Sequence, residues 1–373
     1  MKGKMLKHVI IIGAGVVGLS AARAAIKAGF RVTLLEQGAV PNPQSASHDQ
    51  HRLIRYQYGK AAGYTTMVRH AFGAWQRLWD DLGICLFERT GALGLSHAPT
   101  DYVADTLRTF QDLRIPHERL NSVEIERLAP HLTVPEGTWG LLNEDGGVLL
   151  ADRIVTALAD WVRNAGANVR ANTRVAHVDM YRALVSLGDG TDLQADTVLV
   201  AAGAWLGELL PEFARPTYRQ AVCYVDVPDD IMHQWRSGPC LTDIGIGDNY
   251  ALMPVRDTGL KFGSGAHRTA GGPALGFGAD PDEGCQVMAP FLPFLRHADL
   301  YRPRRMAVGY YVKDSSEAFH ADMVGRTLVI TNCDGQMFKF GPLMGEKLIA
   351  CVQGTLSPAE LKLWSAGGRP ASE

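Results

Sequence analysis

The chain has 373 residues, of which 46% are hydrophobic and 20% are charged. This is the composition of a folded globular protein, and it excludes a disordered or collagen-like chain. The 37 Lys and Arg residues nearly balance the 39 Asp and Glu residues, for a formal net charge of -2. Such a balance gives no electrostatic signature of binding to nucleic acid or to an anionic membrane. The length predicts two or three domains.

The six cysteines are too few for a disulfide framework, and none forms the pairs typical of a zinc site. We therefore expect reduced thiols, a cytoplasmic location and no bound metal. The apolar stretch near the N-terminus is interrupted by Gly13, Gly15 and Gly18, and then by Arg23 and Lys27. These interruptions favour the first strand of a folded domain over a signal peptide or a membrane span.

The first predicted unit is a strand, a glycine-rich loop, a helix and a second strand. Residues 9–12 form a β-branched run, which is typical of a strand buried on both faces of a parallel sheet. The loop that follows matches the GxGxxG pattern and consists of Gly13, Ala14, Gly15, Val16, Val17 and Gly18. Residues 19–27 favour a helix, and residues 31–35 predict the second strand, which ends at Glu36.

This order predicts a βαβ unit that binds the ADP half of a dinucleotide. Gly13 allows a tight turn, Gly15 lets a pyrophosphate approach the backbone, and Gly18 lets the helix pack closely on the strand. The free N–H groups of the helix attract the phosphates. Glu36 suits two ribose hydroxyls and disfavours NADP. The motif leaves NAD and FAD open, because both contain ADP.

The middle of the chain predicts one helix and two strands, over residues 152–165, 166–175 and 197–200. The last of these strands runs into Ala201, Ala202 and Gly203. Small side chains at this turn let the backbone pass close to a bulky group.

The C-terminal part predicts a second loop of the same kind. Residues 327–331 form a strand, a glycine-containing loop follows, and residues 343–352 form a helix. A loop at a helix N-terminus is suited to an anion or a carbonyl group. Residues 218–227 and 250–263 alternate as strands do and lie outside these units.

Several segments resemble the D-amino-acid-oxidase-type flavoproteins, and within them the monomeric sarcosine oxidase and N-methyltryptophan oxidase group. They include the N-terminal VIIIGAGVVGLSAARAAIKAGFRVTLLE, the ADTVLVAAGAWLG segment and the C-terminal GQMFKFGPLMGEKL. SHDQHRLIRYQYG at residues 47–59 is the most diagnostic, because it is similar to SHGDTRIIRHAYG of that group. FERTGALGL at residues 87–95 and GLKFG at residues 259–263 extend the resemblance over nearly the whole chain.

The resemblance implies a mixed α/β fold with two domains. The expected FAD-binding domain is Rossmann-like, with a parallel sheet, and it is assembled from residues 1–85, 145–215 and 320–373. The expected substrate domain has a mixed, largely antiparallel sheet and comprises residues 86–144 and 216–319. All of these boundaries are approximate.

The resemblance also implies roles for five residues. Arg52 is expected beside the flavin, and Tyr311 matches an aromatic residue of the active site. Arg55 and Lys339 match residues that bind the substrate carboxylate, for which a guanidinium offers two parallel hydrogen bonds. Lys261 matches the lysine that activates oxygen. For each charged residue, the alternative is a solvated surface side chain.

The expected FAD contacts come from the motifs above and from the strand over residues 166–175. They are Gly13, Ala14, Gly15, Val16, Val17, Gly18, Glu36, Gln37, Ser47, His48, Arg52, Val175, Ala202, Gly203, Trp205, Gly335, Gln336, Met337, Phe338 and Lys339. We also consider Trp205, Tyr250 and Met253 as pocket residues, with a core position as the alternative.

The sequence departs from the group at two positions. Gly309 aligns with the cysteine that links the flavin covalently. Cys333 lies near the C-terminal flavin loop, but we interpret it as a buried structural cysteine and not as a flavin link. We therefore expect dissociable FAD. Gly265 stands in place of an active-site histidine, for which His267 is a weak substitute. Both departures weaken the case for a simple N-methyl amino acid substrate.

The predicted activity is FAD-dependent oxidation of the C–N bond of an amine or amino acid that carries a carboxylate. The expected partners are a small-molecule amine substrate and O₂, which is reduced to H₂O₂; the products are an imine and peroxide. The protein is expected to be a monomer or a small homo-oligomer. Alternatives are a dehydrogenase or tailoring enzyme for a cyclic amine or imine, a non-enzymatic flavin-binding protein, and an NAD-dependent dehydrogenase.

Overall fold

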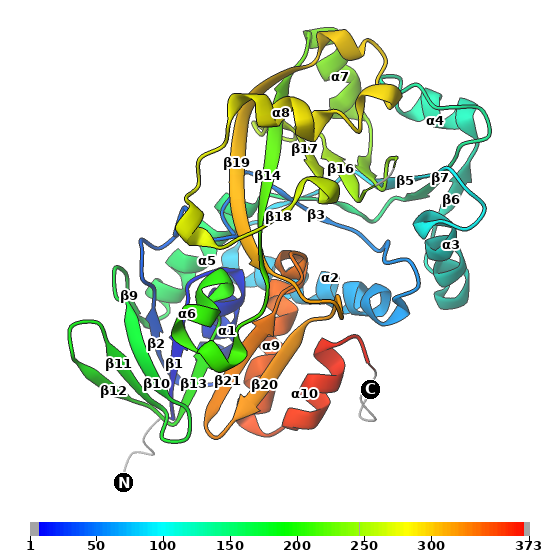
Figure 1. Cartoon of the computed structure of the whole chain (residues 1–373). Coiled ribbons are helices and arrows are strands. Elements are labelled where there is room, and N and C mark those ends of the chain that lie inside the picture. Colours follow the sequence, from blue (N-terminus) through cyan, green and yellow to red (C-terminus); the bar gives the residue numbers. More distant parts are fainter. Residues whose placement is uncertain (1–6, 246, 369–373) are drawn as a thin grey trace.

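A computed structural model describes residues 7–245 and 247–368. Its lower part in Figure 1 is built on a six-stranded sheet. The strand order is β20 (His320–Val324), β21 (Thr327–Asn332), β13 (Thr197–Val200), β1 (His8–Ile12), β2 (Arg31–Leu35) and β9 (Asn168–Arg170). Neighbouring strands from β21 to β9 are parallel, and β20 is antiparallel to β21. The central strand β1 is buried along its whole length, as expected for a β-branched strand covered on both faces.

Helices cover one face of this sheet and a small antiparallel sheet covers the other. The helices are α1 (Val16–Lys27), α5 (Ala151–Asn164), α9 (Gly341–Gln353) and α10 (Pro358–Ser365). The closest packing is between α1 and α9, where a Cβ on Gly345 would lie 2.5 Å from the Ser20 carbonyl carbon. The small sheet consists of β10 (Val175–Asp179), β11 (Leu184–Leu187) and β12 (Asp192–Gln194), and it shares a core with Ile10 and Val198.

The upper part of Figure 1 holds a nine-stranded, mainly antiparallel sheet. Its strands are β18 (Thr269–Ala270), β14 (Thr217–Asp226), β17 (Leu260–Ser264), β16 (Asn249–Leu252), β15 (Cys240–Thr242), β5 (Ala92–Ser96), β7 (Trp139–Asn143) and β6 (Glu118–Leu120), with β19 (Arg302–Val312) paired to β14. The surrounding helices are α3 (Tyr102–Leu113), α4 (Ser122–Leu128), α7 (Asp229–Ser237) and α8 (Pro281–Met288). The long strands β14 and β19 run down from this sheet to the six-stranded one.

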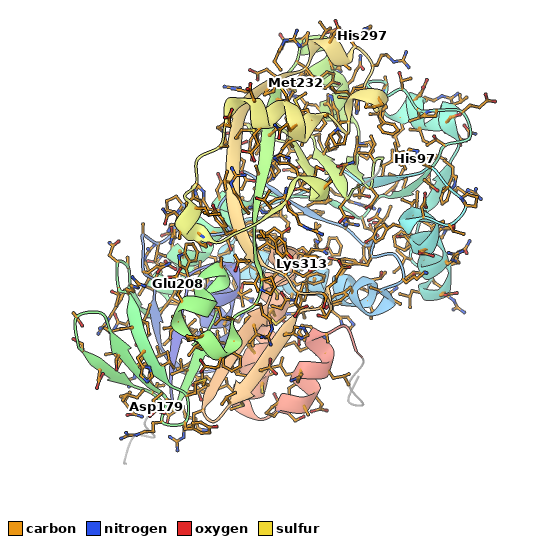
Figure 2. The ribbon with its side chains drawn as sticks, viewed as in Figure 1. His97, Asp179, Glu208, Met232, His297 and Lys313 are labelled. Atoms are coloured by element: carbon orange, nitrogen blue, oxygen red, sulfur yellow. The ribbon has the colours of Figure 1, made fainter. Side chains whose placement is uncertain are left out.

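The two large sheets are connected by a third, small sheet and by the long helix α2 (Ala62–Leu82). The small sheet consists of β3 (Arg52–Ile54), β8 (Gly147–Leu149) and β4 (Phe87–Arg89). A short helix, α6 (Leu206–Leu209), follows β13 and carries Glu208, which Figure 2 labels beside the six-stranded sheet. Lys313 directly follows β19 and lies near the meeting point of the two halves (Figure 2).

The predicted fold class, a parallel sheet with helices plus a largely antiparallel sheet, is confirmed. Three element boundaries differ from the expectation. Helix α1 already begins at Val16, so the second half of the glycine motif is helical. The strand expected over residues 166–175 is limited to β9, and the strand expected over residues 250–263 is two strands, β16 and β17, joined by a turn. Within residues 7–245 and 247–368, no helix is long and apolar enough to cross a membrane.

Candidate active site

A cavity of about 670 Å³ lies where the six-stranded sheet meets β14 and β19. Its walls include the carboxyl ends of three parallel strands, at Ile12, Leu35 and Ile330, and the C-terminal half of β19 from Ala307 to Val312. In open α/β sheets ligands bind outside the carboxyl ends of the strands, so this is the expected position for a dinucleotide.

The glycine loop forms one end of the cavity, and its conformation requires glycine. Gly13 has a φ of +101°, and a Cβ there would lie 2.4 Å from the carbonyl oxygen of Ala201. A Cβ on Gly18 would lie 1.9 Å from the Gly13 oxygen. Both distances are impossible for real atoms, so these two positions exclude any side chain. The predicted roles in turn formation and close packing therefore have a steric basis in this structure.

Glu36 and Ser47 hold the glycine loop in place. The Glu36 carboxylate accepts hydrogen bonds from the backbone N–H of Ala14 at 2.9 Å and of Gly38 at 3.0 Å, and from the Asn42 side chain at 2.9 Å. The hydroxyl of Ser47 accepts a hydrogen bond from Val16 N–H at 2.9 Å. Glu36 is only 7% exposed and lines the cavity, so its carboxylate both anchors the loop and faces the ligand space.

The opposite end of the cavity is formed by β19, by the loop after β21 and by the short helix over Met337–Phe340. Gly335 has a φ of +65°, and a Cβ there would lie 2.9 Å from the Tyr311 ring. A Cβ on Gly309 would meet no atom of the described chain within 4 Å. Gly309 therefore faces open space at this end, and the chain places no thiol at that position.

Most of the predicted cofactor residues surround this one cavity. The lining includes Gly13, Gly15, Val16, Val17, Glu36, Gln37, Ser47, His48, Arg52, Val175, Ala202, Gly203, Trp205, Gly335, Met337 and Phe338. The other four, Ala14, Gly18, Gln336 and Lys339, are not among the lining residues, although each is a sequence neighbour of one that is. An extended cavity with a carboxylate and a glycine loop at one end and open space at the other fits a dinucleotide that carries a broad ring system.

Arg55 and Lys339 come together around a tyrosine. The Lys339 ammonium donates to the Tyr58 hydroxyl at 2.8 Å, and the Arg55 guanidinium lies 5.6 Å from the centroid of the same ring. Burial, together with the charge of Arg55, holds the pKa of Lys339 well below its usual value. Neither Arg55 nor Lys339 is among the described residues that line the cavity. Lys339 directly follows the lining residues Met337 and Phe338 in the short helix Met337–Phe340, and the Arg55 side chain is 17% exposed.

Arg55 already has partners in the protein. It donates to the carbonyl oxygen of Gln57 at 2.5 Å and lies 3.5 Å from the Asp243 carboxylate. Tyr102 accepts a weaker hydrogen bond from it at 3.4 Å. Burial raises the pKa of Asp243, although Arg55 acts in the opposite direction. A ligand carboxylate at this place would therefore compete with Asp243 for the guanidinium.

Lys261 and Arg52 share a second carboxylate, which belongs to Asp49. Asp49 accepts from Lys261 at 2.9 Å and from Arg52 at 2.5 Å. The Tyr224 hydroxyl also donates to it. Arg52 and Asp49 line the cavity, whereas Lys261, which is described and 1% exposed, does not. The Lys261 ammonium also donates to the His51 carbonyl oxygen at 2.5 Å, and its hydrogen bond to Asp49 joins it to a residue of the cavity wall.

Three predicted pocket residues have different outcomes. Tyr250, like Trp205, lines the cavity. Met253 does not, because it is fully buried in the core beside Cys240. The suggestion that His267 substitutes for the missing histidine is not supported, since its ring pairs with Glu283 at 3.0 Å, away from the cavity lining of the described chain.

Sequence reasoning missed the polar residues that hold the cations. Asp49, Tyr58, Tyr224 and Asp243 each contact a predicted catalytic residue, and none was named in advance. Asp49 had a visible signal, because it lies inside the diagnostic segment at a position where the similar motif has glycine. The other three become neighbours only through the tertiary fold. Among the described residues no group of His, Cys, Asp and Glu could hold a metal ion.

Comparisons with known proteins agree with this geometry. The chain is 28% identical over 356 residues to an N-methyl-L-tryptophan oxidase of Salmonella heidelberg (strain SL476), covering 92% of this chain and 93% of that protein. Its fold is similar to NikD, an unusual amino acid oxidase essential for nikkomycin biosynthesis, with a TM-score of 0.80, 19% identity and coverage of 95% and 97%. L-proline dehydrogenase from P. horikoshii gives a TM-score of 0.83 at 17% identity, with coverage of 98% and 99%. The sequence profile of FAD dependent oxidoreductases matches residues 8–351. The chain therefore belongs to the FAD dependent oxidoreductase family.

Proposed function

We propose that this FAD-dependent oxidoreductase oxidises the C–N bond of an amine or amino acid that carries a carboxylate. The observation that supports the carboxylate is the convergence of Arg55 and Lys339 on Tyr58 behind one end of the cavity. The relative that acts on an N-methylated amino acid, an N-methyl-L-tryptophan oxidase, agrees with this substrate class. In this proposal FAD is bound without a covalent link, because Gly309 offers no thiol.

The residues of the chain bind and orient in this reaction. Bound FAD would supply the two-electron acceptor: a hydride from the carbon next to the amine nitrogen would reduce it, and O₂, taking up the two electrons and two protons, would be released as H₂O₂. The amine becomes an imine, which water hydrolyses. Arg55 and Lys339 hold the carboxylate and so fix which carbon faces the ring. Lys261 and Arg52 supply positive charge near the ring, which favours its anionic reduced form.

The test measures preference for the carboxylate. An amine substrate found with a peroxide-detecting panel is compared with its carboxamide, in the wild type and in Arg55→Ala and Lys339→Ala. Losing one partner of a buried charge pair costs about 2–5 kcal/mol, which is roughly 30- to 5,000-fold in kcat/KM. The wild type should prefer the acid, and both variants should lose most of this preference. Arg55→Lys should also be impaired, because an ammonium cannot form the bidentate fork.

The matched control is Arg69→Ala. Arg69 lies on α2 and donates to the Leu113 carbonyl oxygen at 3.1 Å, at the protein surface. Its removal should leave the acid preference unchanged. FAD content is measured for every variant. An equal preference in wild type and variants, with FAD fully bound, contradicts the carboxylate role. Slow reoxidation of the reduced protein by O₂ in stopped flow would instead favour a dehydrogenase.

A further inference from the structure

Asp49 is a buried carboxylate that connects two cations to the cavity wall. It is 7% exposed, and it receives hydrogen bonds from Lys261, Arg52 and Tyr224. The Gln50 N–H also donates to it, at 2.9 Å. Burial opposes ionisation of this group, but the charges of Lys261 and Arg52 outweigh that effect and hold the pKa of Asp49 well below its usual value. Asp49 is therefore a full negative charge at the cavity wall.

The net charge of the cluster formed by Asp49 and its neighbours depends on the charge of Asp49 itself. Arg52 supplies one positive charge and protonated Lys261 a second; burial lowers the pKa of Lys261 to about 8, while the adjacent Asp49 raises it, so the ammonium form predominates at pH 7. His51 is neutral, because burial lowers the pKa of its ring and its Nε2–H donates to Gly259 O at 3.0 Å. Tyr224 is a neutral donor, since burial and the nearby Asp49 raise its pKa strongly.

Two other elements face this cluster. From β19, the Arg305 guanidinium lies 4.1 Å from the centroid of the Tyr224 ring. From β16, burial raises the pKa of Tyr250 to about 12, so this residue is also neutral. Among the described groups named here, Asp49 is the one negative charge beside Lys261 and Arg52. It reduces the combined charge of protonated Lys261 and Arg52 from +2 to +1.

We propose that Asp49 is a positioning residue that holds the Lys261 ammonium and the Arg52 guanidinium at the cavity wall and lowers the reduction potential of bound FAD. Reduced FAD carries more negative charge than oxidised FAD, so positive charge near the cavity favours reduction and a carboxylate opposes it. Asp49 also keeps two like charges close together, which repulsion would otherwise separate. The proposal rests on FAD binding alone and is independent of the amine substrate.

The test is the midpoint potential of bound FAD, measured by dye equilibration without any substrate. Asp49→Asn keeps the shape of the side chain and removes its charge. The ratio of reduced to oxidised FAD at a fixed potential should rise about tenfold, which is about 30 mV for a two-electron couple. Lys261→Met should lower this ratio by a similar factor. The double variant Asp49→Asn/Lys261→Met has the wild-type net charge and should return to within about twofold of the wild type.

The double variant keeps the test decisive if Asp49→Asn alone fails to fold. It leaves no unpaired buried ammonium, and its difference from Lys261→Met isolates the charge of Asp49. The control is Asp81→Asn, because Asp81 likewise joins an arginine and a lysine, Arg23 and Lys27, but lies between α1 and α2. A potential that is equal in Lys261→Met and the double variant, or that shifts equally in Asp81→Asn, overturns the proposal.

Discussion

Glu36 offers a sharp test of the dinucleotide end of the cavity, because its carboxylate has two tasks. It accepts three hydrogen bonds from the protein, and it also faces the cavity where the ribose is expected. One oxygen accepts from Ala14, and the other accepts from Gly38 and Asn42. In Glu36→Gln an NH₂ group replaces one of the two oxygens. This NH₂ donor would then face either the Ala14 N–H or the donors of Gly38 and Asn42. Glu36→Ala removes every acceptor.

The magnitude follows from the number of hydrogen bonds that each variant loses. A hydrogen bond to a charged group contributes about 1.5–3 kcal/mol. Loss of the ribose contact should therefore weaken FAD binding by roughly 10- to 150-fold in either variant. Loss of the loop contacts should also lower the stability of the FAD-free protein, more in Glu36→Ala than in Glu36→Gln. The two effects separate if FAD affinity is titrated by flavin fluorescence and unfolding of the FAD-free protein is measured with urea.

Asn42→Ala is the matched control. It removes one donor to Glu36 and the acceptor of the Gln44 N–H, and it leaves the Glu36 carboxylate in the cavity, which Asn42 also lines. Stability should fall by about 1.5–3 kcal/mol, because the lost bond goes to a charged group, while FAD affinity should change much less than in Glu36→Gln. If Glu36→Gln binds FAD as tightly as the wild type, Glu36 serves the loop alone and does not contact the ribose.

Three further predictions concern sterics, the flavin linkage and acid stability. Gly18→Ala should destabilise the protein by more than about 1–3 kcal/mol or abolish FAD binding, since its Cβ would overlap the Gly13 oxygen. The control, Gly73→Ala on α2, should be neutral or stabilising in the same thermal unfolding and FAD-binding assays. Acid precipitation should release all FAD into the supernatant because of Gly309, and flavin fluorescence that stays with the denatured band would contradict this. Burial lowers the pKa of His131 to about 3, so the unfolded chain binds more protons between pH 6.5 and 3, and stability falls as the pH falls through this window. At pH 5 this costs about 2 kcal/mol, and urea unfolding of His131→Phe should show a smaller loss between pH 8 and pH 5 than the wild type.

The dinucleotide end of the site was predictable because its determinants are local. A buried strand, a loop with glycines at fixed offsets and a helix follow each other within 20 residues. The steric reason for Gly18 lies in that unit, whereas a Cβ on Gly13 would meet the distant Ala201. The strand over residues 197–200 could also be placed, since a short β-branched run ends in small residues. Local sequence could not show that these strands are neighbours in one sheet; the family resemblance implied only that their segments form one domain, and the strand order comes from the structure.

The arrangement of the cations was less predictable because it depends on long-range register. Lys261 meets Asp49 across 212 positions, and Lys339 meets Tyr58 across 281. Which face of β17 carries Lys261 follows from its pairing with β14, opposite Tyr224. A shift of one residue in that register would turn Lys261 to the other face of the sheet. No motif in the single sequence encodes this choice.

Lys261, Arg55 and Lys339 differ in how the protein compensates their charge, and this difference bears on their proposed roles. Lys261 has Asp49 at hydrogen-bond distance, and Arg55 has Asp243 at 3.5 Å. Lys339 forms no ion pair with a carboxylate of the described chain, and its ammonium meets the neutral Tyr58 hydroxyl and, at 3.5 Å, the Gln336 amide oxygen. A buried ammonium without a counter-ion is costly, and burial accordingly lowers its pKa. An incoming carboxylate would supply the missing partner, so among the three cations Lys339 has the most to gain from a ligand of that charge. Lys261 is already paired with Asp49, which it shares with Arg52, and so has less to gain from such a ligand.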